Sequence, residues 1–118
     1  MTNHLILPFA GSLPTFGIVI HTGRRSGKQY RTPINVFPTM DGFRIALTYG
    51  SDSQWVRNVI AAGEARLLTR RREYCVAYPE VVHDERRQGV RLPMRLILRL
   101  VGVADFLSLR AVGQSRRA

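Results

Sequence analysis

The sequence is short of cysteine, of acidic residues and of long apolar segments. Cys75 is the single cysteine, so no disulfide can form within the chain, which fits a reducing compartment. No uninterrupted apolar run approaches the roughly 18 residues that indicate a membrane-spanning helix. Residues 1–12 lack a basic leading region and do not look like a secretory signal. Together these absences favour a cytoplasmic protein.

Basic residues far outnumber acidic ones. The 118 residues include 18 lysines and arginines against 8 aspartates and glutamates, which gives a formal net charge of +10 and a sequence pI of about 11.4. Such a charge favours an anionic partner: nucleic acid, a membrane surface or a polyanionic cofactor. The basic residues are not interleaved with aromatic residues in a pattern that would stack bases, and this disfavours nucleic acid.

The chain length is that of one domain, and we expect a single domain over residues 1–118. Proline and glycine predict an irregular segment over 1–14, and the polar end, 113–118, is expected to fray. Apolar and β-branched residues predict strands over 17–22, 31–37, 43–49, 65–69 and 73–78. Asp41-Gly42 predicts a tight turn between the second and third of these strands.

Helical spacing of apolar residues follows the third strand and recurs near the end of the chain. Four apolar residues fall on one helical face: Trp55, Val56, Val59 and Ile60. Ser51 or Asp52 can cap the first turn of this helix, and Gly63 can end it. Further helices are expected over 93–100 and 105–111. Antiparallel hairpins with one inserted helix and C-terminal helices favour an α+β, mainly β fold, either a small barrel or a sandwich.

The loop after the first strand carries most of the chemical signal. Gly23 and Gly27 allow backbone conformations that turn successive N–H groups toward an anion. Four basic residues fall within eight positions: Arg24, Arg25, Lys28 and Arg31. Ser26 and Thr32 can donate hydroxyl hydrogen bonds. Arginine offers a planar fork to phosphate or carboxylate, so the loop suits a phosphodiester with carboxylates attached.

A Walker-type phosphate loop is excluded by the spacing. That motif needs four residues between its glycines and Ser or Thr after its lysine. Here three residues separate Gly23 from Gly27, and Gln29 follows Lys28. No Gly-x-Gly-x-x-Gly run is present either, which argues against a nicotinamide-binding unit. Composition alone leaves open a solvated basic hairpin loop without function.

Four blocks of sequence occur in an order that resembles a known family. They are Thr22–Lys28, Arg31–Pro33, Ala46–Gly50 and Trp55–Gly63. With these blocks the chain, from about Phe16 to Arg110, resembles the deazaflavin-dependent nitroreductases of actinobacteria. The resemblance implies a split β-barrel of the flavin-reductase and pyridoxamine-oxidase type, which binds coenzyme F-420, an 8-hydroxy-5-deazaflavin. It also implies hydride transfer from the reduced cofactor to a small organic, quinone-like or lipid-like acceptor.

The resemblance also assigns roles to residues. The cofactor's phosphate and oligoglutamate tail would be held by Arg24, Arg25, Ser26, Gly27 and Lys28. The path to the ring would be lined by Arg31, Thr32 and Pro33. The ring would lie along Ala46, Leu47, Thr48, Tyr49, Gly50 and Ser51. Trp55 and Asn58 match the helix beside the pocket. Tyr49 and Ser51 are candidate proton donors, with Tyr30 and solvent as alternatives.

Two other functions are compatible with the sequence. A split barrel that binds FMN or heme is one alternative, and a basic nucleic-acid or membrane-surface protein is another. Arg91, Arg95 and Arg99 recur every four residues in an apolar segment, which is typical of a helix on an anionic membrane or of a helix that closes a barrel. His21 is interpreted as a packing residue or a backbone partner rather than a base. No group of residues has metal-ligand spacing, and the chain is expected to be a monomer or a homodimer at the cytoplasmic face or free in the cytoplasm.

Overall fold

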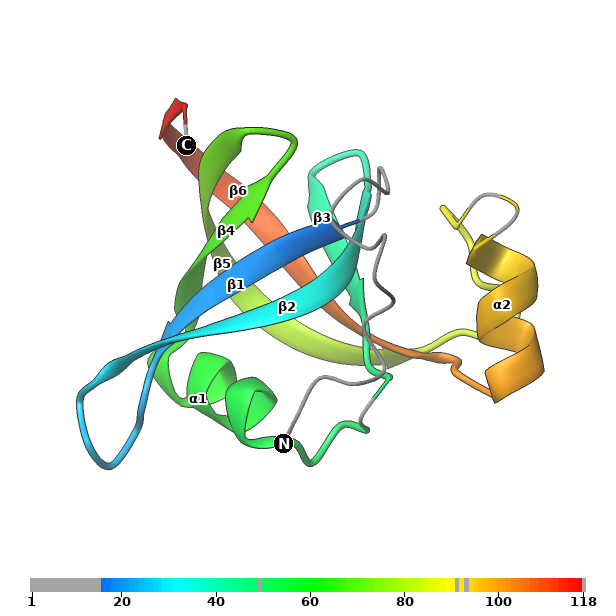
Figure 1. Ribbon diagram of the computed structural model, residues 1–118, viewed down its shortest axis with the longest axis horizontal. Coiled ribbons are helices and arrows are strands. Elements are labelled where there is room, and N and C mark those ends of the chain that lie inside the picture. Colours follow the sequence, from blue (N-terminus) through cyan, green and yellow to red (C-terminus); the bar gives the residue numbers. More distant parts are fainter. Residues whose placement is uncertain (1–15, 49, 91, 93, 118) are drawn as a thin grey trace.

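Six antiparallel strands close into a barrel in this computed structural model, which describes residues 16–48, 50–90, 92 and 94–117 (Figure 1). The strands are β1 (Phe16–Thr22), β2 (Gln29–Pro38), β3 (Gly42–Ala46), β4 (Glu64–Thr69), β5 (Arg72–His83) and β6 (Asp105–Arg117). Helix α1 (Gln54–Ala62) follows β3, and α2 (Met94–Val101) follows β5. Around the barrel the order is β1-β2-β3-β6-β5-β4. The expected mainly β antiparallel barrel is therefore confirmed.

The barrel interior is filled by alternate residues of the strands. In β4, for example, Ala65, Leu67 and Thr69 are buried while the residues between them are less so, as a strand with one face inward requires. The main core combines residues of β1 to β6 with the inner face of α1, and its fully buried members include Val19, Ile45, Val56, Val59, Leu67, Val76 and Leu107. Burial of each large apolar side chain contributes roughly 1.5–3 kcal/mol.

The Asp-Gly turn lies where the sequence places it, between β2 and β3. Gly42 is required there because another strand crosses close by. A Cβ at this position would collide with the backbone carbonyl oxygen of Leu109 in β6. The absence of a side chain therefore allows β6 to pair with β3, from Gly42 opposite Arg110 to Ala46 opposite Phe106.

The helix expected over 105–111 is wrong, as is the frayed end over 113–117: both segments belong to β6. Residue 118 lies outside the described residues. One edge of β6 pairs with β3 and the other with β5, as far as Arg72 opposite Arg117. Without β6, the edges of β3 and β5 would present unpaired backbone groups, so long-range pairing overrides the local pattern. Of the two C-terminal helices that the sequence predicts, the structure therefore has only α2 among the described residues.

Helix α1 confirms the predicted end but not the predicted start. Gly63 adopts the left-handed conformation with φ of 75°, and its N–H donates to the carbonyl oxygen of Val59 at 2.8 Å. Ser53 rather than Ser51 or Asp52 is the N-cap residue, and its hydroxyl donates to the Gly50 carbonyl oxygen instead of capping the helix.

The inner face of α1 differs from the expected one at two positions. Trp55, Val56 and Val59 are buried as predicted. Ile60 is 47% exposed, and its expected place among the buried residues is taken by Asn58, which is 6% exposed. A polar amide therefore lies inside the contact between helix and barrel, where it needs hydrogen-bond partners.

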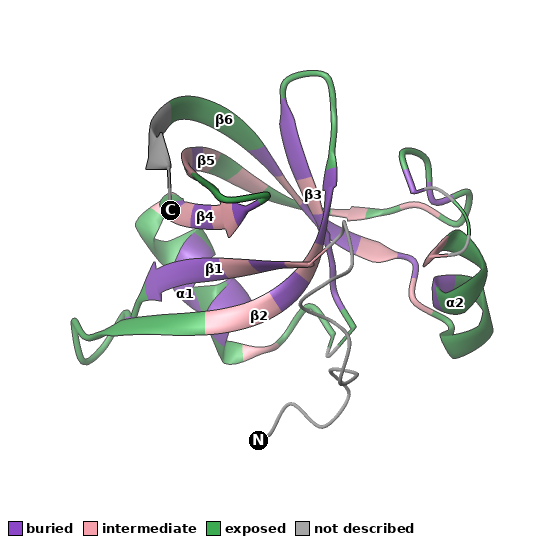
Figure 2. Ribbon diagram, turned by 45° about the horizontal axis from the view of Figure 1, so that its top comes forward, coloured by how far each residue is buried: buried purple, intermediate pink, exposed green. Residues whose placement is uncertain are grey.

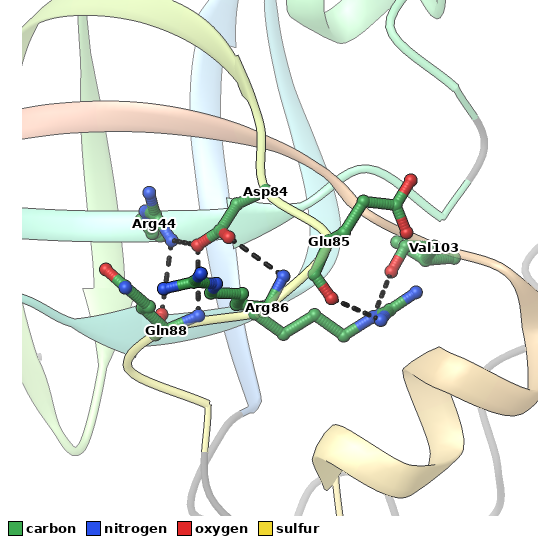
Figure 3. Close-up of polar contacts among 7 residues, drawn as sticks. Arg44, Asp84, Glu85, Arg86, Gln88 and Val103 are labelled. Carbon is green, nitrogen blue, oxygen red and sulfur yellow. Dashed lines mark hydrogen bonds and ion pairs between the residues drawn. The ribbon is translucent and has the colours of Figure 1, made fainter.

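The segment between β5 and α2 is held to the barrel by one aspartate (Figure 3). Asp84 accepts hydrogen bonds from Nη1 of Arg44 in β3 at 2.8 Å and from the backbone N–H groups of Arg86 and Gln88 at 3.0 Å each. The Arg44 guanidinium and these N–H groups lower the pKa of Asp84 from 3.8 to about 2. Arg44 also donates to the Gln88 carbonyl oxygen, so the pair fixes both ends of a tight turn.

Helix α2 lies to one side of the barrel and does not close it (Figures 1 and 2). Of its residues only Leu98 is buried, in a small second core with Phe37, Ala46, Val90 and Phe106. The sequence-based alternative of a helix that closes the barrel is therefore wrong, because the strands close it themselves. No helix among the described residues is long and apolar enough to cross a bilayer.

Candidate functional site

An open groove of about 720 Å³ lies between the β1–β2 hairpin and the first half of α1. The hairpin and the helix are neighbours at one end of the barrel (Figure 1). The lining residues come from the end of β1, the loop after it, the start of β2 and the start of α1. They are His21, Gly23, Arg24, Arg25, Ser26, Tyr30, Arg31, Thr32, Ser53, Gln54, Trp55, Arg57 and Asn58.

A chain of hydrogen bonds joins the two walls of this groove. Oδ1 of Asn58 accepts from the backbone N–H of Arg24 at 3.2 Å and from its Nη1 at 2.8 Å. Nδ2 of Asn58 lies 3.1 Å from Nδ1 of His21. Nε2 of His21 lies 2.9 Å from the hydroxyl of Thr32. The buried amide of α1 thus connects the loop, β1 and β2.

The donors in this chain fix the direction of every hydrogen bond. Both Arg24 groups can only donate, so the Asn58 oxygen faces Arg24 and its amide nitrogen donates to His21. Nδ1 of His21 is then an acceptor, and the neutral ring carries its proton on Nε2, which donates to Thr32. Burial lowers the pKa of His21, which keeps the ring neutral. The Thr32 hydroxyl accepts from His21 and keeps its own proton available for an acceptor in the groove.

The groove is strongly electropositive. Four arginines line it: Arg24, Arg25, Arg31 and Arg57. Among the described residues no acidic side chain lines it. Asp52 contacts Arg57 from outside at 3.5 Å, but both side chains are more than half exposed, and such pairs contribute little. The first turn of α1 contains no acidic residue, so its free N–H groups add further positive potential. The arrangement suits a ligand with several negative charges.

The expectation that Gly23 and Gly27 turn their N–H groups toward an anion is wrong. The N–H of Gly23 donates to the carbonyl oxygen of Lys28 at 2.8 Å, and that of Gly27 donates to the carbonyl oxygen of Gly23 at 2.9 Å. The N–H of Lys28 donates to the Ser26 hydroxyl. These three N–H groups are therefore already paired within the loop, and we assign anion binding to the side chains.

Comparison with known proteins supports the fold. No protein-family model matches the chain, and no curated protein sequence matches it. Several solved structures do match. One of them, named F420 Reductase, superposes with a TM-score of 0.60 at 15% identity, over 86% of this chain and 90% of that chain. The two chains share a fold. At this identity the likeness establishes the split-barrel architecture alone.

The groove contains some of the residues that the sequence assigns to a cofactor and not others. Seven line it: Arg24, Arg25, Ser26, Arg31, Thr32, Trp55 and Asn58. Seven other described residues do not: Gly27, Lys28, Pro33, Ala46, Leu47, Thr48 and Gly50. Ala46 and Leu47 are buried in the two cores. Of the candidate proton donors, Ser51 is exposed outside the groove lining, and Tyr49 lies outside the described residues.

Sequence reasoning missed four residues of the groove: His21, Ser53, Gln54 and Arg57. His21 was interpreted as a packing residue or a backbone partner; it is 6% exposed and is the central link of a hydrogen-bond chain between side chains. The signal was its position two residues after Val19, because both side chains then point into the barrel. A polar residue on an inward face needs partners. Arg57 adjoins Asn58 on α1 and carries no signal that separates it from an ordinary surface arginine.

Proposed function

We propose that the protein binds coenzyme F-420 in this groove and is an F-420-dependent oxidoreductase. The observation that carries the proposal is the groove's lining, which combines four arginines, a hydroxyl donor and an apolar wall without any acidic residue. Its volume lies within the roughly 300–1,000 Å³ of small-molecule sites. A phosphate and several carboxylates match the arginines, and a flat ring matches the side chain of Trp55. The fold shared with a protein named F420 Reductase supports the same reading.

The residues divide into those that bind charge and those that orient. Arg25, Arg31 and Arg57 would hold the anionic groups, because among the described residues no hydrogen bond engages the guanidinium groups of Arg25 and Arg31, and that of Arg57 makes only an exposed contact with Asp52 at 3.5 Å. Arg24 is committed to Asn58 and is a positioning residue. Thr32 would donate its directed proton to an acceptor atom of the ligand. When bound, the deazaflavin supplies the hydride that the reaction transfers.

The acceptor we propose is a small organic, quinone-like or lipid-like molecule. Tyr30 is the described tyrosine in the groove, and its hydroxyl lies 3.1 Å from that of Ser26. It is 43% exposed, so it can exchange its proton with water. We therefore favour Tyr30 as the donor to a reduced product, with Tyr49 and Ser51 as the alternatives from the sequence.

The decisive experiment is a fluorescence titration of the purified protein with oxidised coenzyme F-420, with FMN titrated in parallel. We expect saturable binding of the deazaflavin, and weaker or no binding of FMN. Loss of a hydrogen bond to a charged group costs about 1.5–3 kcal/mol, so Arg31→Ala should weaken binding roughly 10–100-fold. Lys28→Ala should have a smaller effect because Lys28 does not line the groove.

Arg110→Ala is the matched control. Arg110 is exposed on β6, and its substitution removes the same charge at a site away from the groove. If Arg110→Ala weakens binding as much as Arg31→Ala, only the overall charge matters and the groove is not the site. Equal binding of FMN would favour the alternative of a flavin-binding barrel, and binding of neither compound would exclude the proposed function.

A further inference from the structure

Helix α2 presents four rows of side chains, each two residues long. Residues four apart lie above one another on a helix, so the rows pair 94 with 98, 95 with 99, 96 with 100, and 97 with 101. The first row, Met94 and Leu98, packs against the barrel. The second row is Arg95 and Arg99, and both are exposed. The last two rows are entirely apolar.

These two apolar rows face solvent. Leu96 is 50% exposed, Ile97 43%, Leu100 77% and Val101 64%. Single exposed apolar residues are ordinary in proteins, but contiguous ones on a projecting element mark an interaction surface. We call these four residues the apolar face of α2. Leu92, which is 66% exposed, comes just before the helix. In Figure 2 most of α2 has the colour of exposed residues.

The segment around the apolar face is basic throughout. Residues 86–104 contain five arginines and no acidic residue. Arg95 and Arg99 form the row next to Leu96 and Leu100, so a helix that buries those leucines in a bilayer places the arginines at its polar surface. Long arginine side chains can reach phosphate groups from such a position. This pattern is typical of helices that lie in the surface of an anionic membrane.

We propose that α2 docks the protein onto membranes rich in anionic phospholipids, with its apolar face in the boundary between headgroups and acyl chains. The helix is suited to carry the barrel because it is fixed at both ends. Leu98 is fully packed in the second core, and the preceding turn is tied down through Asp84 and Arg44. Nε of Arg87 donates to the carbonyl oxygen of Val103 at 2.7 Å, which joins the turn to the segment after the helix.

A second copy of the chain is a poorer occupant of this face. An eight-residue helix is about 12 Å long. A stable dimer buries about 800 Å² on each partner, which so short a helix cannot supply alone. Each copy also carries a net charge of +10, and a symmetric contact would bring the arginine rows of two copies together. Anionic lipid instead complements both the apolar rows and the charge.

The test is co-sedimentation of the full chain with vesicles of phosphatidylcholine, and of phosphatidylcholine with phosphatidylglycerol in a 3:1 ratio. We expect binding to the anionic vesicles that weakens as salt is raised, and little binding to the neutral ones. The double variant Leu96→Gln with Leu100→Gln should reduce the partition coefficient at least about tenfold. Arg95→Gln with Arg99→Gln should reduce it by a similar factor at low salt.

Two matched double variants separate this surface from generic stickiness and charge. Ile60→Gln with Val112→Gln removes two exposed apolar side chains on α1 and β6. Arg70→Gln with Arg71→Gln removes two exposed charges at the β4–β5 tip. Both should bind vesicles like the unchanged protein. Equal losses in these variants, absence of binding by the unchanged protein, or equal binding to neutral vesicles would each overturn the proposal.

A dimer that dissociates in Leu96→Gln with Leu100→Gln, measured by sedimentation velocity without lipid, would also overturn it and assign the face to a second copy. The proposal is independent of the proposed function. Coenzyme F-420 affinity should stay unchanged in all four double variants, because none of their residues lines the groove. Circular dichroism confirms that each variant is folded.

Discussion

The two helices of this barrel are inserted in equivalent ways but are used differently. Each follows a strand and leads into the next one, and neither is needed to close the sheet. Helix α1 buries Trp55, Val56, Asn58 and Val59 against the barrel, whereas α2 buries only Leu98. Because the strands alone close the sheet, the two helices can form other surfaces of the protein. α1 builds one wall of a polar groove, and α2 carries an apolar face outward.

The difference extends to how polar groups are treated. Asn58 is buried in α1 because its amide makes three hydrogen bonds, two with Arg24 and one with His21, and His21 in turn directs the Thr32 hydroxyl into the groove. In α2 both the arginines and two of the leucines are exposed to solvent. A polar side chain is therefore buried in α1 because it is hydrogen-bonded. Apolar side chains are exposed in α2 against the hydrophobic effect, as expected for a surface that binds a partner.

The largest predicted effect tests the packing of α2. Leu98→Ala removes a leucine that is 1% exposed and should lower the free energy of unfolding by about 3 kcal/mol. Leu100→Ala removes a leucine that is 77% exposed and should change it by less than about 0.5 kcal/mol. Urea denaturation measures both. Similar losses in the two variants would mean that the apolar face is packed in solution and not free to dock.

The next effect concerns the anchor of the segment that carries α2. Because the pKa of Asp84 falls from 3.8 to about 2, Asp84→Asn should cost about 2 kcal/mol of unfolding free energy at pH 7. The folded-state pKa is depressed, so this contribution is present above pH 3.8 and is lost as the pH falls toward 2. Asp41→Asn is the control, because its pair with Arg110 is 3.8 Å long and exposed. A loss below about 0.5 kcal/mol is expected there.

A smaller effect probes the groove side of the comparison. Thr32→Val should weaken coenzyme F-420 binding about tenfold, because the directed donor is lost, and should leave the Nε2 proton of His21 without its acceptor. Thr32→Ser retains the hydroxyl and should restore most of the affinity. If Thr32→Val binds as well as the unchanged protein while Thr32→Ser binds poorly, the threonine methyl group rather than the hydroxyl contacts the ligand. Fluorescence titration at constant salt gives the affinities.

Local sequence was enough to predict most of the barrel and part of the groove. The Asp-Gly turn and the β4–β5 hairpin depend on turn residues and on alternation between neighbours in sequence. Arg24, Arg25 and Arg31 belong to the same hairpin and line one groove, and their role in cofactor binding stays a prediction. These features depend on residues that are close together in the sequence, so they can be predicted from it.

The rest depends on contacts between distant segments. Residues 105–111 carry helix-like spacing, and only the free edges of β3 and β5 make them a strand. His21 and Asn58 are 37 residues apart, so neither shows its role without the fold. The glycine N–H groups were assigned to a ligand because sequence does not show which loop carbonyls would accept them. Whether a polar group is free or already paired is a property of the fold.

The smallest effect compares one histidine from each region through pH. Burial lowers the pKa of His21, so its contribution to stability is present above pH 6.5 and is lost as the pH falls below that value. Hydrogen bonds that the His83 ring donates to Asp105 and Glu85 raise the pKa of His83, which lies at the end of β5, so its contribution is present below pH 6.5 and is lost as the pH rises. The stability lost in His21→Gln should therefore be larger at pH 8 than at pH 5.5, and that lost in His83→Gln should be larger at pH 5.5. Urea denaturation at the two pH values gives these differences, and a common sign would show that the two regions do not hold their histidines in opposite charge states.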